Sequence, residues 1–123
     1  MWKYYCPGKY KNEGDCTVRA LCKALGIDWL SAYDLLVSKG RDMQRMPDSI
    51  ETIKGVLSDF DFVYTGLKIE RGKRRPTVAD FASAHPTGRY VLSVASHMVT
   101  VINGDWYDTW DCGGRCVYSY WSG

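Results

Sequence analysis

Apolar residues recur at helical spacing in the first half of the chain and alternate with polar residues in its last third. Repeats of the form i, i+3, i+4, i+7 predict amphipathic helices. Four segments are expected to be helical: residues 16–25, 29–39, 48–59 and 78–84. Residues 70–76 are rich in basic side chains and are expected to form a loop.

Capping residues suggest where these helices begin and end. Asp15 is a suitable N-cap for the first helix, and Thr77 is one for the fourth. Gly26 is expected to end the first helix and Gly40 the second. The side chains expected to face the core are Val18, Leu21, Cys22 and Leu25 in the first helix, Leu30, Tyr33, Leu36 and Val37 in the second, and Ile50, Ile53, Val56 and Leu57 in the third.

From Gly88 onward a period of two indicates strands. They are expected over residues 90–94, 97–102, 105–111 and 116–121, with a weaker strand over 61–69. Asn103-Gly104 and Gly113-Gly114 are typical two-residue hairpin turns. The sequence therefore predicts one α+β domain over residues 1–123, with N-terminal helices packed on a C-terminal antiparallel meander. Its aromatic last strand is expected to be an exposed edge that pairs with a partner.

The Asn103-Gly104 turn fixes which side chains share a face of the sheet. A loop of only these two residues places His97 opposite Trp110 and makes Asp108 its diagonal neighbour on the same face. Diagonal neighbours lie roughly 7–8 Å apart, within side-chain reach. A carboxylate there can accept a hydrogen bond from one ring nitrogen of His97 and leave the other free to face a thiol.

Cys16 lies in the first turn of the first predicted helix. Unpaired backbone N–H groups and the helix dipole favour an anion there, so its thiolate is stabilised. Arg19, one turn on, is expected to lower the thiol pKa further. By contrast Cys22 belongs to the apolar stripe and is interpreted as a small core residue.

The chain has five cysteines, and an odd number leaves at least one thiol free. In a reducing compartment all five can be thiols. Cys112 and Cys116, with Cys6, form an alternative metal-binding or redox set, but three sulfurs without a clear fourth ligand are a weak zinc signature. No metal and no cofactor are therefore expected.

The net charge of +2 is too small to indicate a nucleic-acid partner. Apolar runs are far shorter than the roughly 20 residues that cross a bilayer, so no membrane partner is expected. The first residues lack the apolar region of a signal peptide, which favours a cytoplasmic location. The basic loop, with Arg71, Lys73, Arg74 and Arg75, leaves open an alternative role in binding acidic partners or nucleic acid.

Three segments together resemble papain-like cysteine peptidases: Asn12-Glu-Gly-Asp-Cys16-Thr-Val-Arg19, His97-Met-Val-Thr-Val and Trp106-Tyr-Asp108-Thr-Trp110. The sequence is most similar to small bacterial and phage-encoded members and to the leader-cleaving domains of bacteriocin exporters. The resemblance implies a papain-like fold in which the cysteine begins a helix, the histidine opens a strand and the acidic residue lies on the next strand.

That resemblance implies a catalytic triad in which Cys16 is the nucleophile, His97 the base and Asp108 the orienting residue. Such enzymes hydrolyse amide bonds of peptides or proteins through an acyl-enzyme. An upstream glutamine usually helps to bind the oxyanion, and here that position is Tyr10. Asn12 is the substitute candidate, with the backbone N–H of Cys16 as the second donor.

Two further functions fit the same layout. Peptidoglycan amidases and endopeptidases also have a cysteine at a helix start and a histidine on a strand, and Asp15-Cys16-Thr17 fits them locally. A papain-like fold can also serve as a non-catalytic binding protein. The specificity pocket is expected among the 6–15 loop, the second and third helices and residues 62–75, whereas the substrate and the oligomeric state are left open. The other histidine, His85, precedes a proline and is interpreted as structural.

Overall fold

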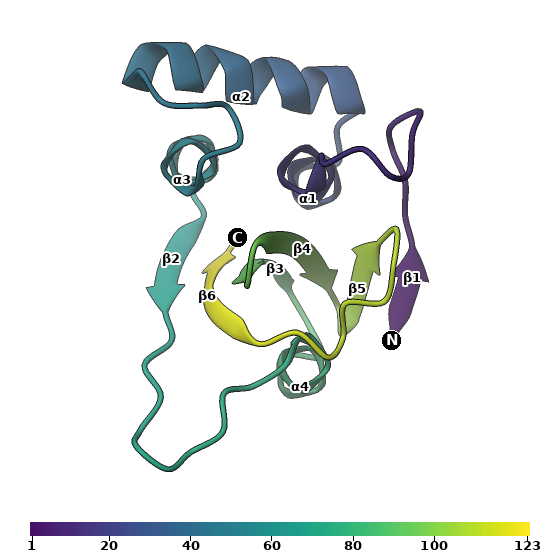
Figure 1. Ribbon diagram of the computed structural model, residues 1–123, viewed down its shortest axis with the longest axis vertical. Coiled ribbons are helices and arrows are strands. Elements are labelled where there is room, and N and C mark those ends of the chain that lie inside the picture. Colours follow the sequence, from purple (N-terminus) through teal and green to yellow (C-terminus); the bar gives the residue numbers. More distant parts are fainter.

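The computed structural model describes residues 1–123 and has an α+β fold (Figure 1). Its helices are α1 (Cys16–Leu25), α2 (Trp29–Met43), α3 (Ile50–Asp59) and α4 (Val78–Ala84). Its strands are β1 (Trp2–Tyr4), β2 (Val63–Gly66), β3 (Arg89–Val94), β4 (His97–Ile102), β5 (Asp105–Asp108) and β6 (Val117–Ser122). None of the helices is both long enough and apolar enough to span a membrane.

The strands form one sheet in the order β1-β5-β4-β3-β6-β2. All neighbouring strands are antiparallel except β1 and β5, which are parallel. Helices α1 and α3 cover one face of the sheet, α2 lies over both of them, and α4 covers the opposite face (Figure 1). Each face has its own apolar core, one around Leu21 and Trp121 and the other around Phe81 and Val99.

The predicted bounds of α1 and α4 are confirmed. Gly26 ends α1 in a left-handed conformation, with φ of 67°. Thr77 caps α4 and forms a reciprocal capping box with Asp80. The carboxylate of Asp15, however, makes no capping hydrogen bond to α1. It points into the interior instead, where it forms an ion pair with buried Arg19.

The end and the buried face of α2 were predicted wrongly. The helix continues through Gly40 to Met43, and its buried residues are Ala32, Leu36 and Gly40. A Cβ atom at Gly40 would lie 2.7 Å from the backbone oxygen of Arg45, so this glycine permits a close approach of the chain rather than a stop. Leu30 and Tyr33, expected in the core, are exposed, and so is Ile50 at the start of α3.

The Asn103-Gly104 hairpin is confirmed. Ile102 pairs with Asp105 and Val101 with Trp106, as a two-residue loop requires. Both turn residues have positive φ, 50° for Asn103 and 82° for Gly104, which is the backbone conformation that a type I′ turn requires.

The last strand does not continue the meander. Instead of pairing with β5, β6 crosses the sheet and lies between β3 and β2. Gly113-Gly114 is therefore not a hairpin turn. A Cβ atom at Gly113 would lie 2.7 Å from the Trp106 ring, so packing explains that glycine. The C-terminal strand is also not an edge, since Trp121 is buried and the edges are β1, which was not predicted, and β2.

Candidate active site

Three ends of secondary structure meet at one side of the sheet. Cys16 is the first residue of α1, His97 the first of β4 and Asp108 the last of β5. Cys16 and His97 both line a cleft of about 880 Å³, which is also bordered by Asn12, Asp48 and Trp110. The fold therefore brings together the three residues that the sequence predicts as a catalytic set.

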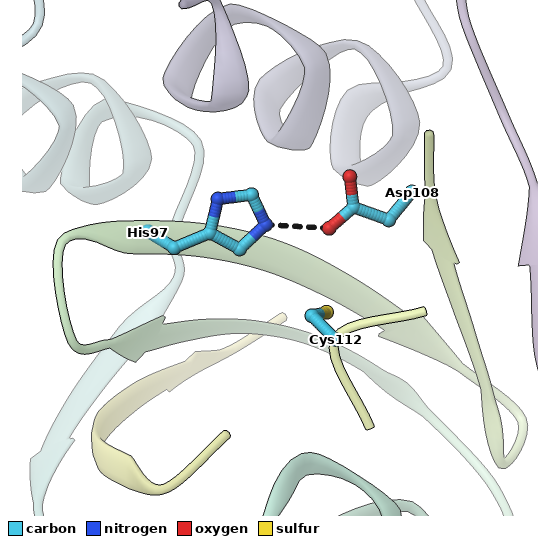
Figure 2. A group of neighbouring side chains, drawn as sticks. All are labelled: His97, Asp108 and Cys112. Atoms are coloured by element: carbon cyan, nitrogen blue, oxygen red, sulfur yellow. Dashed lines mark hydrogen bonds and ion pairs between the residues drawn. The ribbon is translucent and has the colours of Figure 1, made fainter. Parts of the chain in front are cut away.

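His97 and Asp108 are directly hydrogen-bonded. The Nε2 atom of His97 lies 2.5 Å from Oδ2 of Asp108, and Figure 2 shows the other ring nitrogen facing α1. The Trp110 ring lies against the imidazole, with 4.9 Å between the ring centroids. The short turn places His97 and Asp108 on one face, and Trp110 helps to exclude water from their bond.

Asp108 is fully buried and its second oxygen is also satisfied. Oδ1 accepts a hydrogen bond from the backbone N–H of Thr109 at 2.7 Å and forms an ion pair with Arg19 at 3.0 Å. Burial opposes ionisation, but the hydrogen bond and charge of His97, together with the charge of Arg19, hold the pKa of Asp108 below its ordinary value. The carboxylate is thus charged and fixed in position.

The pKa values of His97 and Cys16 shift in opposite directions. Burial disfavours the charged imidazole, but hydrogen bonding with Asp108, Cys112 and Cys16 outweighs burial and raises the pKa of His97 to about 11. Burial likewise opposes the Cys16 thiolate, but His97, the backbone N–H of Met98 and the Thr17 hydroxyl lower the pKa of Cys16. This arrangement favours a thiolate–imidazolium pair.

Arg19 was expected to lower the pKa of Cys16, but it is not among the groups that do so, and its side chain is buried. Its guanidinium bridges Asp15, with Nη1 2.7 Å from Oδ1, and Asp108. Asp15 in turn accepts a hydrogen bond from Nε1 of Trp29 at 2.8 Å. Arg19 therefore acts on His97 through Asp108. The i, i+4 spacing of Asp15 and Arg19 was the sequence signal for the first of its two ion pairs.

Cys112 is a member of the site that sequence analysis did not place there. Its Sγ and ligand atoms of His97 and Asp108 all lie within 4.8 Å of one another (Figure 2). Burial raises the pKa of Cys112, so this thiol stays protonated and can donate a hydrogen bond to Asp108. Of Cys16 and Cys112, only Cys16 has a lowered pKa.

The oxyanion candidates lie in the same cleft. Asn12 is exposed, lines the cleft with Cys16 and makes no hydrogen bond within the protein. The backbone N–H of Cys16 belongs to the first helical turn, where no preceding helical carbonyl can accept it. Tyr10, at the position that carries glutamine in the resembled family, is exposed and lines a neighbouring cavity.

The remaining candidates lie outside this site. The ring of His85 stacks on Phe81 and makes a hydrogen bond with its backbone oxygen, which supports a structural role. All five cysteines are free thiols, and Cys6 and Cys116 do not join Cys112 in a ligand cluster. Residues 62–75, expected to help line the specificity pocket, do not contribute to either large cavity.

The charged side chains of the basic loop are only partly available to a partner. Arg74 forms an ion pair with Asp80. Arg75 donates to the backbone oxygens of Leu67 and Val117 and lies over the Tyr118 ring. Two of the four basic side chains of the loop therefore already have partners within the protein.

Comparisons of the chain with models of protein families, with curated proteins and with solved structures found no match.

Proposed function

We propose that the protein is a cysteine hydrolase that cleaves amide bonds in peptides or proteins. The observation that carries this proposal is the convergence of Cys16, at a helix N-terminus, with the hydrogen-bonded His97–Asp108 pair at one cleft. A nucleophile, a base that faces it and a group that orients the base are the residues that acyl transfer requires. The opposed pKa shifts of Cys16 and His97 support it.

The proposed reaction begins with attack of the Cys16 thiolate on a carbonyl carbon. The negative charge that develops on the carbonyl oxygen is stabilised by the Cys16 backbone N–H and the Asn12 amide. As the C–N bond breaks, the imidazolium of His97 gives its proton to the departing amine, which leaves a thioester on Cys16. Neutral His97 then takes a proton from water, and the hydroxide so formed releases the acid and restores the thiolate.

Thiol alkylation tests this proposal most directly. Iodoacetamide would be titrated against the protein between about pH 5 and 9, and the modified cysteine located by mass spectrometry. We expect Cys16 to react first, well below the ordinary thiol pKa of 9.0, and His97→Ala to abolish this early reaction. Equal reactivity of Cys16 and a free thiol, or prior reaction of Cys112 or Cys116, would contradict the proposal.

The substrate class also separates the two related hydrolase functions. Peptidoglycan amidases act on amide bonds of the cell wall, whereas peptidases act on polypeptides. Solubilised wall fragments and a denatured protein would be offered to equal amounts of wild-type and Cys16→Ala protein. If the wild type releases new amino groups from only one of these two substrates, that substrate gives the class. Release from neither, with Cys16 activated, favours the non-catalytic binding protein.

A zinc centre is the second candidate function, and the cluster of His97, Asp108 and Cys112 favours it. Imidazole, carboxylate and thiolate are all zinc ligands. Binding would require His97 and Asp108 to separate and Cys112 to lose its proton, against the direction of its pKa shift. Stoichiometric zinc in the purified protein that is lost in Cys112→Ser would support this function over the hydrolase.

A further inference from the structure

A second cavity of about 800 Å³ opens next to the catalytic cleft, between residues 7–15 and the first turns of α2. We call it the α2 groove. Its apolar lining includes Trp29, Leu30, Tyr33 and Met46. Neither the fold nor the proposed chemistry at Cys16 requires this hollow, so it needs its own explanation.

Several large apolar side chains that line the α2 groove are exposed to solvent. Leu30 is 65% and Met46 71% exposed, and the rings of Trp29 and Tyr33 stack with 5.0 Å between their centroids. The same helix turns Leu36 into the core. Contiguous exposed apolar surface of this kind marks a binding site in soluble proteins, because leaving it in water is unfavourable.

The charges around the α2 groove are mostly negative. Glu13, Asp28 and Asp48 line it and form no ion pairs, whereas Lys9 is its only cation. The charge of the fourth carboxylate, Asp15, is balanced by Arg19. An occupant that complements this surface therefore carries apolar side chains and positive charge.

The α2 groove adjoins the catalytic cleft. Glu13, Gly14 and Asp48 line both cavities. A chain of polar contacts also joins the two, since Trp29 in the groove bonds Asp15, Asp15 pairs with Arg19, and Arg19 pairs with Asp108. A peptide bound in the groove would therefore lie beside the cleft that contains Cys16.

We propose that the α2 groove binds a basic, apolar segment of the peptide substrate and so determines which peptides reach Cys16. Identifying this segment as part of a substrate rests on the hydrolase function proposed above; the binding itself does not. Leu30, Tyr33 and Trp29 supply the apolar contact. The three carboxylates that form no ion pair, of which Asp28 also caps α2, select lysine and arginine over acidic residues.

Binding to Cys16→Ala protein tests the groove without any turnover. The probe is a fluorescently labelled synthetic peptide that alternates leucine or phenylalanine with lysine, and anisotropy reports its binding. We expect saturable binding that weakens about tenfold or more when serine replaces the apolar residues or glutamate replaces lysine. Leu30→Ser and, separately, Tyr33→Ala are expected to weaken it similarly, with circular dichroism confirming that each variant is folded.

Val63→Ser provides the matched control, because Val63 on β2 is 63% exposed, like Leu30, but lies outside the groove. Absence of saturable binding, equal binding of the glutamate peptide, or equal losses in Val63→Ser and Leu30→Ser would overturn the inference. Sedimentation that shows a dimer disrupted by Leu30→Ser would also overturn it, because a second copy would then occupy the groove.

Cys16 alkylation separates this inference from the proposed function. An activated Cys16 without peptide binding would leave the hydrolase proposal intact and refute the groove. Peptide binding at Leu30 with an ordinary Cys16 thiol would establish the groove and refute the hydrolase.

Discussion

At the scale of single residues, the charge of His97 depends chiefly on one carboxylate. Asp108 holds the imidazole through Nε2, and this bond is the first of the contacts that raise the pKa of His97 against the effect of burial. The same imidazolium lowers the pKa of Cys16. Because the thiol and the imidazole interact, their protons belong to the pair and a change at Asp108 affects both titrations.

Asp108→Asn tests this dependence. The amide keeps the shape of the side chain but removes its charge, so we expect the pKa of His97 to fall from about 11 toward its ordinary value of 6.5. Histidine ring resonances followed by NMR during a pH titration measure this directly. Asp111→Asn is the control, because Asp111 accepts a hydrogen bond from the Trp106 indole and forms neither a hydrogen bond nor an ion pair with His97. An unchanged His97 titration in Asp108→Asn would contradict our account.

Arg19 carries a second residue-scale prediction. It is only 4% exposed and pairs with two buried carboxylates, Asp15 and Asp108. Its removal leaves buried Asp15 without a cation and Asp108 with His97 alone, so we expect Arg19→Met to lower the free energy of unfolding by about 3–5 kcal/mol. The surface pair of Lys39 with Asp59 is the control, and Lys39→Met should cost about 0–1 kcal/mol. Urea unfolding measures both, and equal losses would refute the prediction.

The sequence predicted the His97–Asp108 contact because a local feature determines it. A two-residue turn sets the register of β4 and β5, and register decides which side chains share a face. Arg19 and Asp108 are far apart in the chain, and Cys112 lies beyond the end of β5, where no strand pairing fixes its position. No local rule places those segments together, so these members of the site could only be found in the structure.

At the scale of elements, α2 shows how a helix pattern can be assigned to the wrong face. Leu30 and Tyr33 fit the apolar stripe with Leu36, and yet the core receives Ala32, Leu36 and Gly40 at a spacing of four. Small residues let α2 approach its neighbours closely, and the larger side chains remain outside in the α2 groove. The pattern predicted the helix correctly, while packing against α1 and α3 decided its orientation.

Gly40 and Gly55 give the element-scale prediction. In a helix interior, alanine is favoured over glycine by about 0.5–1 kcal/mol. At Gly40 the new Cβ would lie 2.7 Å from a backbone oxygen, so Gly40→Ala should lower the free energy of unfolding by about 1–3 kcal/mol. At Gly55 the nearest atoms belong to the flexible side chains of Met43 and Lys39. Gly55→Ala should therefore be neutral or stabilising. Thermal unfolding of both variants measures this difference, and a Gly55→Ala protein less stable than Gly40→Ala would contradict the prediction.

At the scale of the whole molecule, the fold class was predictable but the strand order was not. Turn chemistry correctly joined β4 to β5. It failed at Gly113-Gly114, where the chain leaves β5 and returns on the far side of β3. Pairing of β6 with β3 and β2, and of β1 with β5, joins distant segments and is selected by burial of residues such as Trp121, which no turn signal encodes.

Global stability should depend on pH through His97. Its pKa in the folded protein, about 11, lies above the ordinary value of 6.5. Its contribution to stability is therefore complete below 6.5 and is lost progressively as the pH rises through 11. Cys16 acts oppositely, because its pKa is lowered from 9.0 and its contribution is lost as the pH falls. Replacing Cys16 with alanine removes this opposing effect.

We therefore expect Cys16→Ala protein to lose stability between about pH 6.5 and 9, with a slope of up to about 1.4 kcal/mol per pH unit for one proton. In Cys16→Ala/His97→Gln the slope should disappear, because glutamine can donate to Asp108 but does not titrate. Cys22 and Cys112, whose pKa values burial raises, contribute only above this range, since their ordinary value is 9.0. Urea unfolding at a series of pH values gives both slopes, and equal slopes would show that His97 is not held as an imidazolium in the folded protein.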